Sequence, residues 1–177
     1  MTNGTKTPRV YVASLADYNA GRLHGVWVTL RPFCSVAELV EHLERETAAM
    51  LKASREEFAE EWAIHDYENF GDHHAFGEHE DFSYIAKVAA FIHEHGDAAR
   101  AFFHVFGRDD VSIDDFDAYY VGEWSSTRAF AEDQAYEYFD MDSPVAQFFF
   151  WDKYERMLFR DLYLEHDGYV FRRDSDF

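Results

Sequence analysis

The chain has 177 residues, 35 acidic and 16 basic, so its formal net charge is -19, yet 47% of the residues are hydrophobic and 19% are aromatic. This amount of apolar side chain predicts a folded core and excludes a solvated acidic tail. The single cysteine, Cys34, excludes an intrachain disulfide. We find no apolar run of membrane-spanning length and no signal-peptide pattern, so we expect a cytoplasmic protein.

The first third of the chain predicts a small sheet with one helix across it. Strands are expected over residues 10–15, 23–30 and 61–67, with a turn-rich loop over 17–21. Between the second and third strands, a capping box predicts the start of a helix whose apolar residues recur at spacings of three and four. The capping residues are Ser35 and Glu38, and the apolar positions are Val36, Leu39, Val40, Leu43, Thr47, Met50 and Leu51.

The rest of the chain alternates between helices and shorter elements. Residues 69–81 carry two glycines and no periodicity, which indicates a loop. Two helices are expected next, one from Phe82 to the stop at Gly96 and one capped by Asp97 that runs to Gly107. The later elements are a strand or helix over 116–124, a helix capped by Ser126 that runs to about Phe139, an aromatic segment from Pro144, and a closing strand over 168–172.

The charge is concentrated in the middle of the chain. Residues 1–60 carry 8 acids and 7 bases, residues 61–142 carry 20 acids and 4 bases, and residues 143–177 carry 7 acids and 5 bases. A segment this negative repels nucleic acid and anionic membranes. The pattern indicates a protein partner with a positive surface.

Four stretches, in this order, resemble the ArdA antirestriction family. The first is PRVYVASLADYNAGRLHGVWVTL, with Tyr18, Asn19, Gly25, Trp27 and Val28. The second is EEWAIHDYENF, with Glu61, Ile64, Asp66, Tyr67 and Glu68, and the third is YVGEWSSTRAFA, with Tyr120, Gly122, Ser126, Phe130 and Ala131. The closing stretch is WDKYERML followed by YVFR. Together they cover nearly the whole chain.

The resemblance implies an α+β protein that forms an elongated chain of three small domains and a homodimer. We expect a sheet-plus-helix domain over 1–61, an acidic and mainly helical domain over 62–107, and an α+β domain over 108–177 that carries the dimerisation region. The family's members imitate the phosphates of bent DNA and block the DNA-binding channel of type I restriction-modification enzymes. The expected function is therefore competitive inhibition, with no catalysis and no cofactor.

Carboxylates suit such mimicry because they are ionised at pH 7 and accept bidentate contacts from arginine much as phosphates do. We therefore expect the partner-binding side chains among the acids of the middle segment. They are Asp66, Glu68, Asp72, Glu78, Glu80, Asp81, Glu94, Asp97, Asp109, Asp110, Asp114, Asp115, Asp117, Glu123, Glu132, Asp133, Glu137, Asp140 and Asp142.

Two other functions remain open from the residues alone. A similar charge array would also suit another DNA-binding protein, such as a repressor, a nucleoid protein or a CRISPR effector. A metal-binding module would use His65, His73, His74 and His79 with the neighbouring acids, but their spacing matches no closed zinc site, so no metal is expected. Adjacent acids such as Asp114 and Asp115 carry little catalytic information, and a phosphate-binding loop and a nucleophile elbow are both missing.

Overall fold

A computed structural model describes residues 7–71, 76–107 and 112–173 of the chain, which divides into two compact units, residues 1–103 and 104–177. Each unit contains its own three-stranded antiparallel sheet with helices beside it, so the predicted α+β class is confirmed. The three-domain division and the elongated arrangement stay predictions. Within the described residues, no helix is both long enough and apolar enough to span a bilayer.

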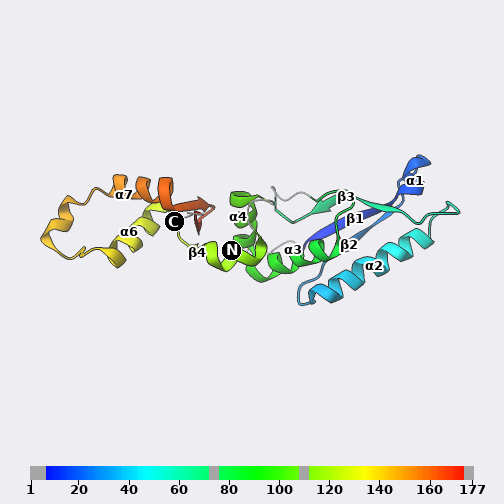
Figure 1. Cartoon of the computed structure of the whole chain (residues 1–177), viewed down its shortest axis with the longest axis horizontal. Helices are drawn as coiled ribbons and strands as arrows, with labels where there is room; N and C mark the ends of the chain where they lie inside the picture. The colour runs from blue at the N-terminus through cyan, green and yellow to red at the C-terminus, as the bar shows by residue number, and fades with distance from the viewer. Residues whose placement is uncertain (1–6, 72–75, 108–111, 174–177) are drawn as a thin grey trace. The chain divides into compact units, whose positions relative to one another are not determined.

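The first unit is built around a sheet with the strand order β2-β1-β3, in which both outer strands run antiparallel to the central one (Figure 1). Its elements are β1 (Arg9–Ser14), α1 (Leu15–Asn19), β2 (Gly25–Thr29), α2 (Val36–Lys52), β3 (Trp62–Glu68) and α3 (Phe82–His95), and most of α4 (Asp97–Phe106) also belongs to this unit, which ends at residue 103. Residues 62–68, which the three-domain division places in the middle domain, thus belong to the first sheet.

The helix α2 begins as its sequence predicts. The Ser35 hydroxyl accepts from the Glu38 backbone N–H, and the Glu38 carboxylate accepts from the Ser35 backbone N–H, which completes the capping box. Leu39, Leu43 and Met50 are buried on its inner face. Because α2 lies along the sheet (Figure 1), its apolar face forms the core together with strand residues and α3.

Aromatic side chains fill much of both cores. In the first unit, the Phe91 ring lies 6.0 Å from that of Phe102 and 5.6 Å from that of Phe103, measured between centroids. In the second unit, Phe130 is fully buried beside Trp124 and Tyr163. Rings of this size bury much apolar area for each residue, which suits small units with little interior.

The second unit has a sheet with the strand order β4-β6-β5. Its elements are η1 (Ile113–Asp115), α5 (Phe116–Tyr119), β4 (Tyr120–Glu123), α6 (Thr127–Tyr138), η2 (Pro144–Phe148), α7 (Trp151–Met157), the π-helical turn η3 (Leu158–Leu162), β5 (Tyr163–His166) and β6 (Tyr169–Arg172). The Ser126 hydroxyl caps α6 by accepting from the Ala129 N–H, as predicted. The ambiguous stretch 116–124 contains both a helical turn and a strand.

Two elements correct the sequence predictions. Residues 15–19, predicted to lie mostly in a loop after the first strand, form the short helix α1, capped by the Ser14 hydroxyl. The strand β5 was not predicted. It pairs with β6 through a turn in which Asp167 and Gly168 have φ values of 51° and 88°. Positive φ at both residues is what a two-residue hairpin turn requires, and an Asp-Gly pair supplies it.

Gly25 of β2 has no room for a side chain. A Cβ atom there would lie 2.6 Å from both the Tyr11 ring and the backbone oxygen of Val12. We predict that Gly25→Ala lowers the free energy of unfolding by about 1–3 kcal/mol, because the central strand must shift to relieve the contact. The control is Gly77→Ala, where a Cβ meets nothing within 4 Å. Urea unfolding of both variants checks this, and equal stabilities would contradict it.

Candidate protein-interaction surface

The structure describes 16 of the 19 predicted partner-binding acids, because Asp72, Asp109 and Asp110 lie outside the described residues. Fourteen of the 16 are exposed, and Glu68 and Glu80 are half-buried. The first unit carries Asp66, Glu68, Glu78, Glu80, Asp81, Glu94 and Asp97, and the second carries Asp114, Asp115, Asp117, Glu123, Glu132, Asp133, Glu137, Asp140 and Asp142. Each unit therefore presents its own set of carboxylates to solvent.

Some of these acids already have partners within the chain. Glu68 accepts from Arg9 at 2.8 Å, Asp97 accepts from Arg100 at 2.8 Å, and Glu132 accepts from Arg128 at 3.0 Å. Asp81 caps α3 by accepting from the Ser83 N–H at 2.6 Å. These contacts orient the four side chains and leave them only partly available to a second protein.

Arg128 pairs with several acids at once. Its guanidinium donates to Glu132 on α6 and to Asp152 on α7, and it lies 3.6 Å from Glu155. The hydrogen bond that Arg128 donates to the Glu132 carboxylate is the main reason that the pKa of Arg128 is raised above its ordinary value. This cation therefore ties α6 to α7 and offers little positive field to a partner.

The exposed acids of the second unit lie on consecutive elements. Asp114, Asp115 and Asp117 are exposed on η1 and α5, within four residues of one another. Asp133 and Glu137 are exposed four residues apart on α6, a spacing that places two side chains on one helix face. Local charge density here is high, as a surface that binds basic side chains requires.

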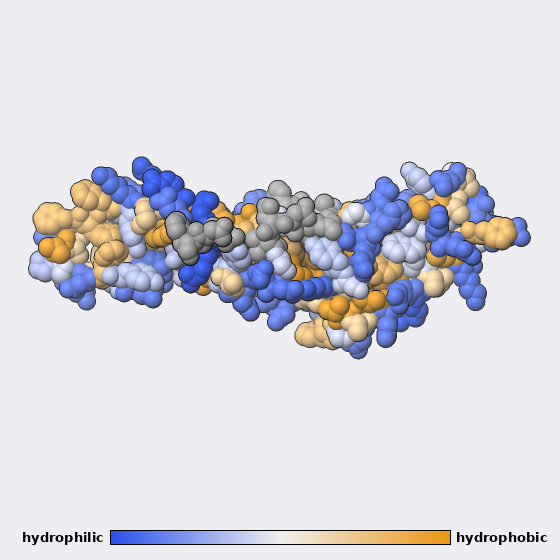
Figure 2. Space-filling view, in the orientation of Figure 1, coloured by the Kyte–Doolittle hydropathy of each residue, from blue (hydrophilic) through white to orange (hydrophobic). Residues whose placement is uncertain are grey.

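Large apolar side chains also reach the surface of the second unit. Figure 2 shows hydrophobic residues gathered over the segment that joins α6 to α7. In this segment the side chains of Val145, Phe148 and Phe150 are 72%, 70% and 71% exposed. Phe149 between the last two is half-buried, 5.1 Å from the Tyr154 ring. We call Val145, Phe148 and Phe150 the apolar patch.

The histidine-rich loop gives no metal centre in the described part of the chain. No three His, Cys, Asp or Glu side chains within residues 7–71, 76–107 and 112–173 gather closely enough to hold one ion. His73 and His74 lie outside those residues. His65 instead packs edge-on against Tyr18, with ring centroids 4.8 Å apart.

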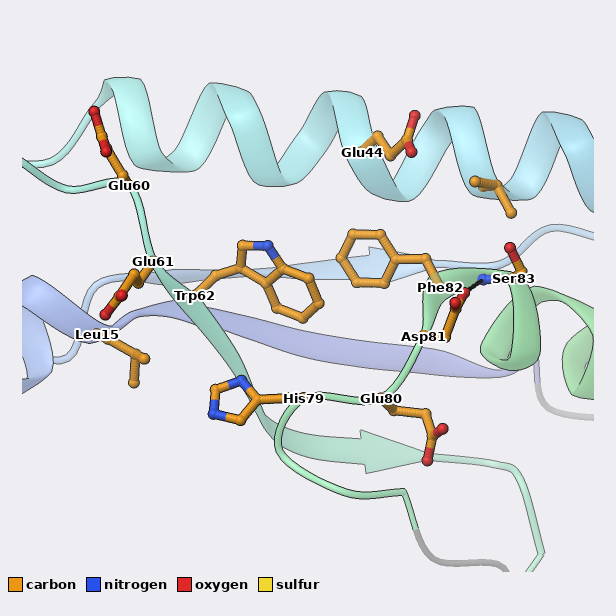
Figure 3. A pocket seen from close by; sticks show the side chains of 11 residues that line it. Leu15, Glu44, Glu60, Glu61, Trp62, His79, Glu80, Asp81, Phe82 and Ser83 are labelled. Carbon is orange, nitrogen blue, oxygen red and sulfur yellow. Dashed lines mark hydrogen bonds between the residues drawn. The ribbon is translucent and has the colours of Figure 1, made fainter.

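A groove in the first unit contains acids that the sequence prediction did not include. Its volume is about 840 Å³, and it lies between α2, the entry to β3 and the start of α3 (Figure 3). Glu44, Glu60 and Glu61 line it together with Trp62 and Phe82. The acidic doublet Glu60-Glu61 directly precedes Trp62, and this run of two acids and an aromatic residue is the sequence signal that could have found the groove.

The family model described as antirestriction protein (ArdA) matches residues 10–172. The chain belongs to the ArdA family. The match spans both units and confirms the resemblance seen in the four sequence stretches. A search of curated proteins found no match. Family membership makes this an antirestriction protein, and the geometry above shows which carboxylates it exposes.

One acid of this ArdA family member is buried and plays a structural part. Asp17 on α1 is 1% exposed and accepts hydrogen bonds from the Ser54 hydroxyl and from Arg22, at 3.2 Å for Arg22 Nη2. Arg22 also pairs with Glu56. The Ser54 hydrogen bond is the main reason that the pKa of Asp17 lies below its ordinary value, because it favours the charged carboxylate.

This pKa shift predicts how stability changes with pH. A carboxyl group whose pKa is lower in the folded state stabilises the fold above its unfolded pKa of about 3.9, and the effect is lost as pH falls through the folded value. We expect Asp17→Asn to be less stable than the wild type at pH 7, with a difference that shrinks below about pH 4. Urea unfolding across pH measures it. The exposed control Glu57→Gln should show little difference at any pH, and a pH-independent deficit in Asp17→Asn would contradict the prediction.

Proposed function

We propose that this chain is a DNA mimic that binds the DNA-binding channel of type I restriction-modification enzymes and inhibits them competitively. The observation that carries the proposal is the set of exposed carboxylates on both units of an ArdA family member. Double-stranded DNA presents about one negative charge per 1.7 Å of its axis, and proteins bind it largely through basic side chains that contact phosphates. A protein that presents carboxylates in place of phosphates binds the same basic side chains, but it has no phosphodiester bond for the enzyme to cleave.

The carboxylates act collectively in this mechanism. An exposed ion pair contributes only about 0–1 kcal/mol, so affinity comes from many weak contacts. The same charge array would also suit a repressor, a nucleoid protein or a CRISPR effector. Family membership is what favours restriction enzymes among these targets.

The collective mechanism predicts that single and multiple substitutions differ sharply. Asp114→Asn alone should change inhibition by less than about threefold, whereas the triple change of Asp114, Asp115 and Asp117 to Asn should weaken it by about tenfold or more. The assay is competition between the chain and DNA for a purified type I enzyme. The control changes Glu41, Glu46 and Glu57 to Gln, which alters the net charge equally outside the predicted acids.

The outcomes separate two parts of the proposal. If the wild type does not compete with DNA, the mimic function is wrong. If the wild type competes but the two triple variants are equivalent, the distributed mechanism is wrong and a discrete site must carry the affinity. Circular dichroism of each variant verifies that the fold is retained.

We also propose that two copies of the chain associate through the apolar patch. Single exposed apolar side chains are ordinary, but a contiguous exposed apolar patch usually marks an interface, and apolar residues gather over this segment (Figure 2). A symmetric contact between two copies would bury the same side chains from each. The patch belongs to the part of the chain in which the sequence predicts the dimerisation region.

The dimer proposal predicts a change in mass. Light scattering after gel filtration should give twice the chain mass of 20.8 kDa for the wild type and the chain mass for Phe148→Ser with Phe150→Ser. The matched control is Phe58→Ser in the first unit, where the ring is 80% exposed. A wild-type monomer, or a double variant that remains dimeric, would contradict the proposal.

A further inference from the structure

The groove in the first unit has an aromatic wall. Trp62 at the start of β3 and Phe82 at the start of α3 stack with ring centroids 4.3 Å apart and planes 17° apart (Figure 3). Both side chains are half-buried and line the groove. Residues about 20 positions apart in the sequence thus form one continuous ring surface.

The rest of the lining is strongly acidic. Five carboxylates line the groove, and its lining contains no lysine or arginine among the described residues; the acids are Glu44, Glu60, Glu61, Glu80 and Asp81. Glu44, Glu60 and Glu61 are exposed, and none of the three pairs with a base that the structure describes. His79 is the one basic residue in the described lining, so the groove offers rings and negative charge without an internal lysine or arginine.

Two other tryptophans in this chain show what such surroundings bind. The Arg9 guanidinium lies 4.4 Å from the Trp27 ring centroid while it pairs with Glu68. The Arg128 guanidinium lies 5.0 Å from the Trp151 centroid while it pairs with Asp152. In both cases one arginine stacks on an indole and bonds a carboxylate. The groove around Trp62 likewise contains an indole ring and carboxylates, but the lining that the structure describes contains no arginine.

We propose that this groove receives an arginine side chain of the partner protein. Guanidinium is planar and weakly hydrated, so it stacks on an aromatic ring and still donates in a fork to carboxylates. This inference rests on the proposed function. In that function, the arginine belongs to the DNA-contacting surface of the inhibited enzyme, where arginine side chains face phosphates. The groove then adds one specific arginine contact to the many weak carboxylate contacts. The phosphates of DNA offer no aromatic ring for an arginine to stack on in this way.

A binding experiment tests the groove without any restriction enzyme. The indole ¹⁵N–H signals of the four tryptophans are followed by NMR while a short arginine-bearing peptide is added, with Trp62 assigned from Trp62→Phe. The Trp62 signal should shift in a saturable way, and a peptide with neutral citrulline at the same positions should leave it unchanged. A lysine peptide should bind more weakly. An unmoved Trp62 signal, or equal binding of all three peptides, overturns the proposal.

A matched pair of variants tests the groove in inhibition. Glu44→Gln with Glu60→Gln neutralises two groove acids, and Glu41→Gln with Glu57→Gln neutralises two exposed acids that do not line the groove. We expect the inhibition constant to rise about tenfold for the first pair and less than about twofold for the second. Equal effects overturn the groove while the mimic function stands. If the wild type itself fails to inhibit, the mimic function is wrong, and the peptide titration still decides the groove.

Discussion

A net charge of -19 on 177 residues drives like charges apart, and the burial of large aromatic rings has to offset that repulsion in each unit. Phe102 and Phe103 are buried in the first unit, and Phe130 and Phe171 in the second. The carboxylates lie at the surface, where water solvates their charge. Asp17 is the one acid among the described residues that is buried, and it is held by a hydroxyl and a guanidinium. The acidic surface therefore depends on the aromatic cores beneath it.

Elements with local signals could be predicted from the sequence, whereas those that depend on distant contacts could not. The capping groups of α2 and α6 identify their starts because the cap and the helix are adjacent in sequence. The helix α1 is too short for periodicity to reveal. Asp167-Gly168 is a hairpin signal, but it indicates the strand β5 only if the closing strand β6 pairs with the residues directly before this turn, which the sequence alone does not establish.

The candidate site was predictable to the extent that it depends on charge alone. Counting acids and bases locates a negative segment. Because unpaired carboxylates are rarely buried, most of its acids are expected to be exposed. The groove could not be found this way, because Trp62 meets Phe82 only after β3 joins the sheet and α3 packs beside α2. The family resemblance was carried largely by structural residues. Gly25 lies under a tyrosine ring, Ser126 caps a helix and Phe130 fills a core.

The apolar patch lies on a unit that also carries many carboxylates, and the two features respond oppositely to ionic strength. Dissolved salt screens charges over about 8 Å at physiological concentration. Screening weakens the attraction between carboxylates and a basic protein, but it also weakens the repulsion between two acidic chains, for which contact through Val145, Phe148 and Phe150 is proposed. If both proposed contacts form, higher ionic strength thus favours contact between copies of the chain at the expense of contact with a basic partner.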